Sequence, residues 1–185
     1  MSGGHRVLPW VALVASFFPF LAWAECVKTV RWYDDAPYAF KGADGQPAGI
    51  AVDLAAAALK TLHCQTSFVE MPWARALLEL QAGRLDLLPG ALKNVEREQF
   101  AHFSRPFANA LLELRLLGLS GVVTRSNVIV SDAPVGFALS KATNTPAFVA
   151  SFDKALGGLM ADGQYKTILE RYLPCTISVE KLGCK

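Results

Sequence analysis

The chain has 185 residues and a formal net charge of +2, from 18 lysines and arginines against 16 aspartates and glutamates. This near balance gives no field of one sign, so the composition argues against nucleic acid or an acidic membrane surface as a partner. The length suits one domain that can bury a core of its own.

The first 24 residues have the three parts of a secretory signal peptide. His5 and Arg6 give a basic start, an apolar stretch runs from Val7 to Leu21, and Ala22-Trp23-Ala24 ends it with the small residues of a cleavage site. The apolar stretch is shorter than the about 20 residues that a membrane span needs. We therefore expect residues 1–24 to be removed on export to the periplasm. An uncleaved membrane anchor is the alternative.

All four cysteines lie in the part of the chain that would be exported, where thiols tend to pair. Cys26 and Cys64 each precede a predicted strand, so parallel neighbouring strands would bring them together. Cys175 and Cys184 would close a small loop near the end of the chain. Three pairings are possible in principle, and we favour these two disulfides. A metal site is the weaker alternative, because there is no C-x-x-C and the three histidines are scattered.

The first half of the chain alternates between strand and helix patterns. Thr29 to Tyr33 and Gln65 to Glu70 are predicted strands, separated by a predicted helix from Val52 to Leu62 with its apolar residues on one face. A second helix is expected next, with Pro72 at its first position and Gly83 placed to end it.

A continuous apolar run from Leu85 to Leu88 then predicts a strand buried on both faces, broken by Pro89-Gly90. A short extended segment is expected at Ala101 to Ser104. This order of elements predicts an α/β fold with a parallel-rich sheet flanked by helices. Ligands of such sheets bind beyond the carboxyl ends of the strands. Three loops are therefore candidate binding loops: Asp34 to Phe40, Met71 to Arg75, and Pro89 to Arg97.

The rest of the chain adds one more strand and two helices. Val135 to Leu139 is the predicted strand, and Thr145-Pro146 is a suitable start for a helix. Asp162-Gly163 interrupts the helical pattern, which resumes and continues until Pro174. The 27 residues from Phe107 to Ala133 are too few for two βαβ units, each of which takes about 30 residues or more.

The sequence has no catalytic signature such as G-x-S-x-G, a phosphate-binding glycine loop or H-E-x-x-H. Asp86, inside the apolar run, is interpreted as a strand-end residue paired with a neighbour. Recognition chemistry is better represented, because aromatic side chains near the strand ends could wall a small-molecule site. The aromatic candidates are Tyr33, Tyr38, Phe40 and Trp73, and ordinary packing is the alternative for each.

Two arginines are candidates for binding an anion. Arg75 lies near the start of one predicted helix, and Asn94 is a predicted N-cap that would put Arg97 in the first turn of another. A cation at that end of a helix is unfavourable, whereas a ligand carboxylate would match the arginine fork and the adjacent N–H groups. Pairing of Arg97 with Glu96, Glu98 or Glu70 is the alternative.

Three segments resemble the bacterial family 3 extracellular solute-binding proteins, the periplasmic receptors of polar amino acid ABC transporters. They read PYAFKGADGQPAGIAVDLAAAAL, MPWARALLELQAGRLDLLPGALKNVEREQFAHFSRPF and FDKALGGLMADGQYKTILERYL. The resemblance covers roughly residues 26–107 and 135–173. It implies a two-lobed clamshell, with residues 25–106 and 134–185 forming the first lobe. Residues 107–133 would then be a shortened insert where relatives have a second lobe.

The resemblance also implies roles for particular residues. Arg97, at the end of a G-x-x-x-x-x-E-R pattern that begins at Gly90, would hold the ligand α-carboxylate, with Ala91 and Leu92 in the same loop. Tyr38 and Phe40 would flank the ligand side chain. Asp34 and Tyr33, beside the first strand, and Trp73 would complete the wall. Leu92 stands where many relatives carry a hydroxyl residue, so one polar contact is lost.

The resulting hypothesis is a periplasmic receptor that binds a small carboxylate-bearing solute without chemistry and without a cofactor or metal. An inner-membrane ABC permease would be its partner, and a homodimer is left open. One alternative is an enzyme on the same scaffold, similar to cyclohexadienyl dehydratase. Another is an interaction protein or degenerate product that no longer binds solute.

Overall fold

The computed structural model describes residues 25–109, 134–173, 177–178 and 181–182. The expected signal peptide, most of the expected insert at 107–133 and the expected Cys175–Cys184 disulfide lie outside these residues. Within them, no helix is long and apolar enough to cross a membrane.

Six strands of the described residues form one mixed sheet in the order β4-β1-β5-β8-β6, with β7 paired to β8. β1 is parallel to β4 and β5, whereas β8 is antiparallel to β5, β6 and β7. The predicted α/β fold with a parallel-rich sheet is therefore confirmed. The strands are β1 (Val27–Trp32), β4 (Gln65–Glu70), β5 (Leu87–Leu92), β6 (Ala101–Phe103), β7 (Ala108–Asn109) and β8 (Pro134–Ser140).

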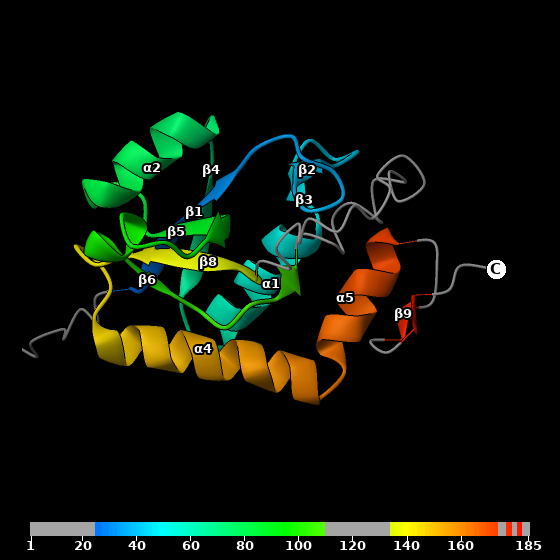
Figure 1. Ribbon diagram of the computed structural model, residues 1–185. Helices are drawn as coiled ribbons and strands as arrows, with labels where there is room; N and C mark the ends of the chain where they lie inside the picture. Colours follow the sequence, from blue (N-terminus) through cyan, green and yellow to red (C-terminus); the bar gives the residue numbers. More distant parts are fainter. Residues whose placement is uncertain (1–24, 110–133, 174–176, 179–180, 183–185) are drawn as a thin grey trace, which may run out of the picture.

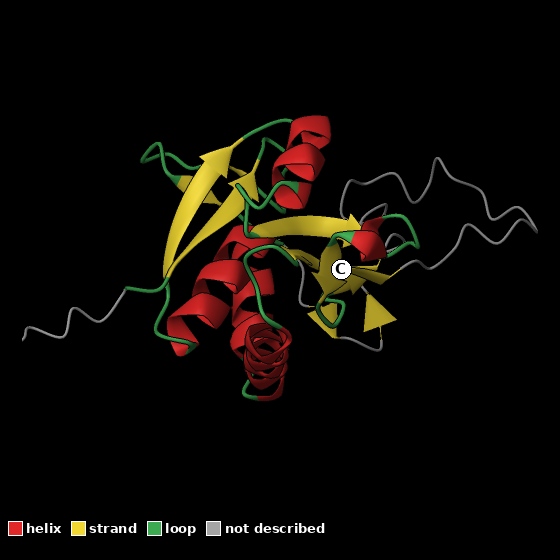
Figure 2. Cartoon of the chain, turned by 90° about the vertical axis from the view of Figure 1, so that its left-hand side faces the viewer, coloured by secondary structure: helices red, strands yellow, loops and turns green. Residues whose placement is uncertain are grey.

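Helices cover both faces of the sheet (Figures 1 and 2). α2 (Trp73–Gln81) lies on one face, and α1 (Ile50–Thr61), α4 (Pro146–Ala161) and α5 (Gln164–Tyr172) lie on the other. Two short hairpins complete the described structure. They pair β2 (Phe40–Lys41) with β3 (Pro47–Ala48), and β9 (Ile177–Ser178) with β10 (Lys181–Leu182).

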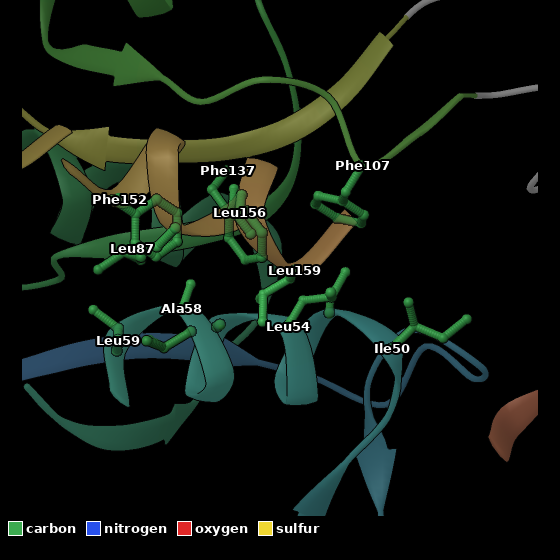
Figure 3. Packing of buried hydrophobic residues seen from close by; sticks show 14 of the residues in the cluster. Ile50, Leu54, Ala58, Leu59, Leu87, Phe107, Phe137, Phe152, Leu156 and Leu159 are labelled. Atoms are coloured by element: carbon green, nitrogen blue, oxygen red, sulfur yellow. The ribbon is translucent and has the colours of Figure 1, made fainter. Parts of the chain in front are cut away.

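The main core lies between the sheet and α1, α4 and α5 (Figure 3). Leu54 and Leu59 of α1 are fully buried against this face of the sheet. The ring of Phe137 on β8 packs edge-on against Phe152 of α4, with 5.4 Å between centroids, and lies 4.8 Å from the ring of Phe107. This row of three aromatic rings extends the core to Phe107, near the end of the described segment 25–109.

The Cys26–Cys64 disulfide is confirmed. Val27 and Gln65 are partners in the parallel register of β1 and β4, so the cysteine before each of them lies at the same end of the sheet. The bond therefore joins the first two parallel strands where both begin.

Several local predictions are also confirmed. β4 has the predicted limits, and the Thr145 side chain accepts a hydrogen bond from the Phe148 N–H at the start of α4. α4 ends before Asp162-Gly163, and α5 follows and ends at Tyr172, two residues before Pro174. These signals are local, since a cap or a breaker acts on the chain beside it.

Three local predictions are wrong. Pro72 has an extended backbone and precedes α2 as its cap, so the helix begins at Trp73. β5 does not stop at Pro89-Gly90 but continues to Leu92 through a bulge, which Gly90 allows by its positive φ of 78°. The helix expected after Asn94 is a single 3₁₀ turn, η1 (Arg97–Gln99), so no long helix dipole acts on Arg97.

Candidate functional site

A pocket of about 250 Å³ lies at the carboxyl ends of the parallel strands. Its walls come from the ends of β1 and β5, the start of α2, the loop after β1, the start of α1 and the beginning of β8. Such an edge is where an open α/β sheet binds its ligand. The lining residues are Arg31, Tyr33, Asp34, Asp35, Tyr38, Ala39, Ala51, Trp73, Pro89, Gly90, Phe107, Ala108 and Val135.

Five of the predicted binding residues line this pocket together. They are Tyr33, Asp34, Tyr38, Trp73 and Gly90. Tyr33 ends the first predicted strand, and the other four come from the three candidate loops, which lie far apart in the sequence. The prediction that the fold gathers these loops at one edge of the sheet is therefore confirmed.

The end of β1 sends its side chains alternately to two sides. Val30 and Trp32 are buried in apolar clusters with α1 residues, whereas Arg31 reaches the pocket on the side of Trp73. Arg31 is only 8 % exposed, and its Nε donates to the Met71 carbonyl at 3.1 Å. Burial lowers the pKa of Arg31, and the negative charge of Asp35 opposes this shift.

Trp73 is the aromatic centre of the site, because two arginines lie against its ring. The guanidinium carbon of Arg31 and that of Arg97 are each 5.6 Å from the ring centroid. Arg31 also lies 5.5 Å from the ring of Tyr33. Both arginines are within the range of cation–π contacts, so the aromatic rings hold the two cations in place.

Arg97 lies beside the pocket rather than among the residues that line it. Its backbone N–H donates to the Asn94 side chain at 2.8 Å, and its Nη1 donates to the Leu92 carbonyl at 2.8 Å. Among the described residues Arg97 forms no salt bridge, and nearby Glu98 pairs instead with Lys93 at 2.8 Å. The alternative that a glutamate neutralises Arg97 is therefore not realised in this structure.

The start of α1 closes one side of the pocket but offers no free anion site. The Ile50 and Ala51 N–H groups donate to the carbonyls of Pro37 and Tyr38 at 3.0 and 2.9 Å. The loop after β1 thus occupies these first helical donors. An anion in the pocket would meet arginine side chains rather than this helix end.

The remaining predicted residues lie elsewhere. Phe40 packs edge-on against Tyr172, with 5.8 Å between centroids, and Arg75 is exposed and pairs with Glu79 at 3.8 Å. Ala91 is buried in the smaller cluster under α2, and Leu92 is 40 % exposed. None of these four residues lines the pocket.

Sequence reasoning missed Arg31, the one cation among the described lining residues. The signal for it was present, because Arg31 stands between the apolar Val30 and Trp32 next to the end of a predicted strand. A charged residue at such a position faces the opposite side from its neighbours. It also missed the apolar wall of Phe107, Ala108 and Val135, since β8 reaches this edge only by returning antiparallel to β5.

Asp86 belongs to the framework and not to the pocket. Its Oδ2 accepts from the N–H and hydroxyl of Thr29 at 2.8 Å each, and Oδ1 lies 3.4 Å from Lys28 Nζ. The interpretation of Asp86 as a paired strand-end residue is confirmed. Among the residues that the structure describes, no group of three or more histidine, cysteine or acidic residues could hold a metal ion.

A family model described as "Bacterial extracellular solute-binding proteins, family 3" matches residues 29–174. The structure is also similar to substrate binding domain 2 of Lactococcus lactis GlnP in its open conformation. The TM-score is 0.64 and the identity 18 %, over 83 % of this chain and 98 % of the other.

Two further solved structures share the fold. The ancestral amino acid-binding protein AncCDT-1, described as a precursor of cyclohexadienyl dehydratase, has a TM-score of 0.61 and 21 % identity, over 80 % of this chain and 95 % of the other. The arginine-bound form of domain 1 from TmArgBP has a TM-score of 0.54 and 21 % identity, over 72 % and 93 %. The described α/β unit therefore has the fold of a lobe of a periplasmic binding protein.

Proposed function

The chain belongs to the bacterial extracellular solute-binding proteins of family 3, and we propose that it is a periplasmic receptor for a small solute that carries a carboxylate. An amino acid or a similar acid is the solute class that fits the site. The protein would bind this solute without changing it chemically. The expected signal peptide at residues 1–24 would deliver the receptor to the periplasm, and an ABC permease in the inner membrane would be its partner.

The observation that carries this proposal is the guanidinium of Arg97 beside the pocket, which has no carboxylate partner among the described residues. It lies against Trp73 and forms no salt bridge within the described part of the chain. An arginine fork binds a carboxylate through two parallel hydrogen bonds, which gives both strength and orientation. A ligand that lies along Trp73 could place its carboxylate on Arg97 and the rest of its atoms in the pocket.

We further propose that residues 107–133 replace the second lobe, so that one lobe supplies most of the binding surface. The arginine-bound structure of domain 1 from TmArgBP supports the idea that a single domain of this fold can hold a ligand. Water would reach one side of such a ligand and would weaken its charged contacts relative to those in an enclosed site. Binding should therefore be weak compared with that of a receptor that closes over its solute.

An enzyme on the same scaffold is the second candidate, because one similar structure is described as a precursor of cyclohexadienyl dehydratase. Proton transfer in such an enzyme would need an acid placed in an enclosed site. The acids among the described lining residues are Asp34 and Asp35, and both are exposed. The geometry thus supports binding better than catalysis.

Calorimetry with a panel of amino acids tests the proposal, with the complete chain and the variant Arg97→Ala. We expect at least one amino acid to bind to the wild type, and Arg97→Ala to weaken that binding by about tenfold or more, because a charge-assisted bidentate contact is lost. Arg75→Ala is the matched control, since the Arg75 side chain is 70 % exposed and its salt bridge among the described residues is with Glu79. It should bind as the wild type does.

Two results would contradict the proposed function. One is that no amino acid in the panel binds to the wild type. The other is binding that is unchanged in Arg97→Ala. Turnover of prephenate or arogenate by the wild type would instead support the enzyme.

A further inference from the structure

Arg31 is a buried cation without a carboxylate partner in the described part of the chain. Only 8 % of the residue is exposed, and it forms no salt bridge there. Among the described residues its one hydrogen bond is from Nε to the Met71 carbonyl, so the two outer nitrogens donate to no group there. Arginines this buried are normally paired with a carboxylate. Since Arg31 lines the pocket, a ligand is the natural source of the missing negative charge.

Arg31 is also the second cation at the same aromatic ring. The guanidinium carbons of Arg31 and Arg97 each lie 5.6 Å from the centroid of Trp73, so they are at most twice that distance apart. The two cations share one site and repel each other, and negative charge placed near both reduces this repulsion. A ligand with one carboxylate neutralises the charge of one arginine, and a ligand with two carboxylates neutralises both.

The pocket also offers negative charge at its exposed side. Asp34 and Asp35 both line the pocket and are exposed, and Asp35 is close enough to oppose the pKa shift of Arg31 without forming a salt bridge with it. These carboxylates can meet a ligand ammonium group at the surface. The charges of the site therefore match a molecule with two anionic groups and one cationic group.

We propose that the pocket selects an amino acid whose side chain is itself a carboxylate, with Arg31 as the residue that sets this specificity. The inference rests on the proposed function, in which Arg97 holds one carboxylate of the ligand. Arg31 then holds the second carboxylate, and Asp34 or Asp35 faces the ammonium group. A pocket of about 250 Å³ has room for a molecule of this size.

The same arrangement disfavours a ligand with a cationic side chain. A guanidinium or ammonium group in the pocket would lie near the charge of Arg31, and like charges at short range repel each other. The proposed specificity thus differs from that of domain 1 from TmArgBP, which is bound to arginine in its structure.

Calorimetry of the complete chain with L-glutamate, L-glutamine and L-arginine tests the inference. Glutamate and glutamine are nearly equal in size and differ in the charge of the side chain. We expect the wild type to bind glutamate at least about tenfold more tightly than glutamine, and arginine more weakly than either. Arg31→Met should remove the preference for glutamate over glutamine, whereas Arg31→Lys should keep part of it.

The outcomes separate this inference from the proposed function on which it rests. If the wild type binds amino acids in an Arg97-dependent way but takes glutamine or arginine as tightly as glutamate, the specificity is wrong and the receptor function stands. The inference also fails if folded Arg31→Met keeps the full preference. If no amino acid binds to the wild type, both are wrong. The comparison of three ligands on the wild type decides the matter even if Arg31→Met does not fold.

Discussion

The carboxylate of Asp86 connects the two central parallel strands at the end opposite to the pocket. Burial raises the pKa of Asp86, but hydrogen bonds from Thr143 and Thr29 and the charge of Lys28 outweigh it, so the pKa lies below its ordinary value. The backbone of Asp86 adds a further hydrogen bond between the same two residues, because the Asp86 N–H donates to the Thr29 hydroxyl at 2.8 Å. The side chain is 14 % exposed, so water replaces these contacts poorly when they are lost.

Asp86→Asn should therefore reduce the free energy of unfolding by about 1.5–3 kcal/mol at neutral pH, the range for hydrogen bonds to charged groups. A carboxylate with a lowered folded pKa stabilises the fold above its unfolded pKa of about 3.9, and this contribution disappears as the pH falls through the folded value. The difference in the free energy of unfolding between the wild type and Asp86→Asn should thus be constant from about pH 5 to 7 and should decrease below about pH 4.

Urea unfolding across this pH range is the measurement. Glu170→Gln is the control, because Glu170 forms only an exposed i, i+4 pair with Lys166 and should change stability by less than about 0.5 kcal/mol. If the difference in the free energy of unfolding between the wild type and Asp86→Asn increases in acid, the Asp86 carboxylate does not stabilise the fold in this way.

Residue by residue, the sequence predicted chemical type better than location. Trp73 and Tyr33 were predicted at the site because both stand at or near the carboxyl end of a predicted strand, and both line the pocket. Arg75 was predicted as an anion-binding residue near the start of a helix, yet it forms a salt bridge with Glu79 on the exposed side of α2. Arg31 was missed although its place between Val30 and Trp32 set it on the opposite side of the strand, because that alternation alone does not distinguish a surface position from a pocket.

At the scale of elements, the junction between the β2–β3 hairpin and α1 shapes the loop side of the pocket. Gly49 stands there with a φ of 126°, and a Cβ at this position would overlap the Tyr38 carbonyl. This close approach brings the first N–H groups of α1 to the carbonyls of Pro37 and Tyr38. Only glycine combines this backbone conformation with so close a contact.

Gly49→Ala should accordingly cost at least about 1–3 kcal/mol of stability from backbone strain alone, with a further loss from the overlap. Gly158→Ala is the matched control, because it lies inside α4 with open space around it and should stabilise the protein by about 1 kcal/mol. The midpoint of thermal unfolding should be lower than that of the wild type in Gly49→Ala and higher in Gly158→Ala. Equal stability of Gly49→Ala and the wild type would show that the junction is not constrained in this way.

The elements themselves were largely predictable, because caps, breakers and apolar periodicity act locally. β4, α4 and the break before α5 are examples. The course of β5 through Pro89-Gly90 was not predictable in this way. Its partner β8 pairs with it on both sides of the bulge, and that partner comes from more than 40 residues later in the chain. Long-range pairing overrode a strong local breaker.

For the whole molecule, the central claim is that one α/β lobe forms a carboxylate-binding pocket around Trp73. The sheet brings three loops to its carboxyl edge, α1 closes the loop side, and the start of β8 adds an apolar wall. The position of this edge followed from the alternation of strands and helices. The shape of the pocket could not be predicted in this way, since it depends on the antiparallel pairing of β8 with β5, which only the complete fold brings about.

The most direct test of this claim is the indole N–H signal of Trp73 in ¹H–¹⁵N spectra of the complete chain, identified because it is absent from Trp73→Phe. L-glutamate and L-glutamine are titrated in turn, and acetamide, which lacks a carboxylate, is the control. We predict that both amino acids shift the Trp73 signal in a saturable way and that acetamide leaves it in place. A Trp73 signal unmoved by either amino acid would contradict the account.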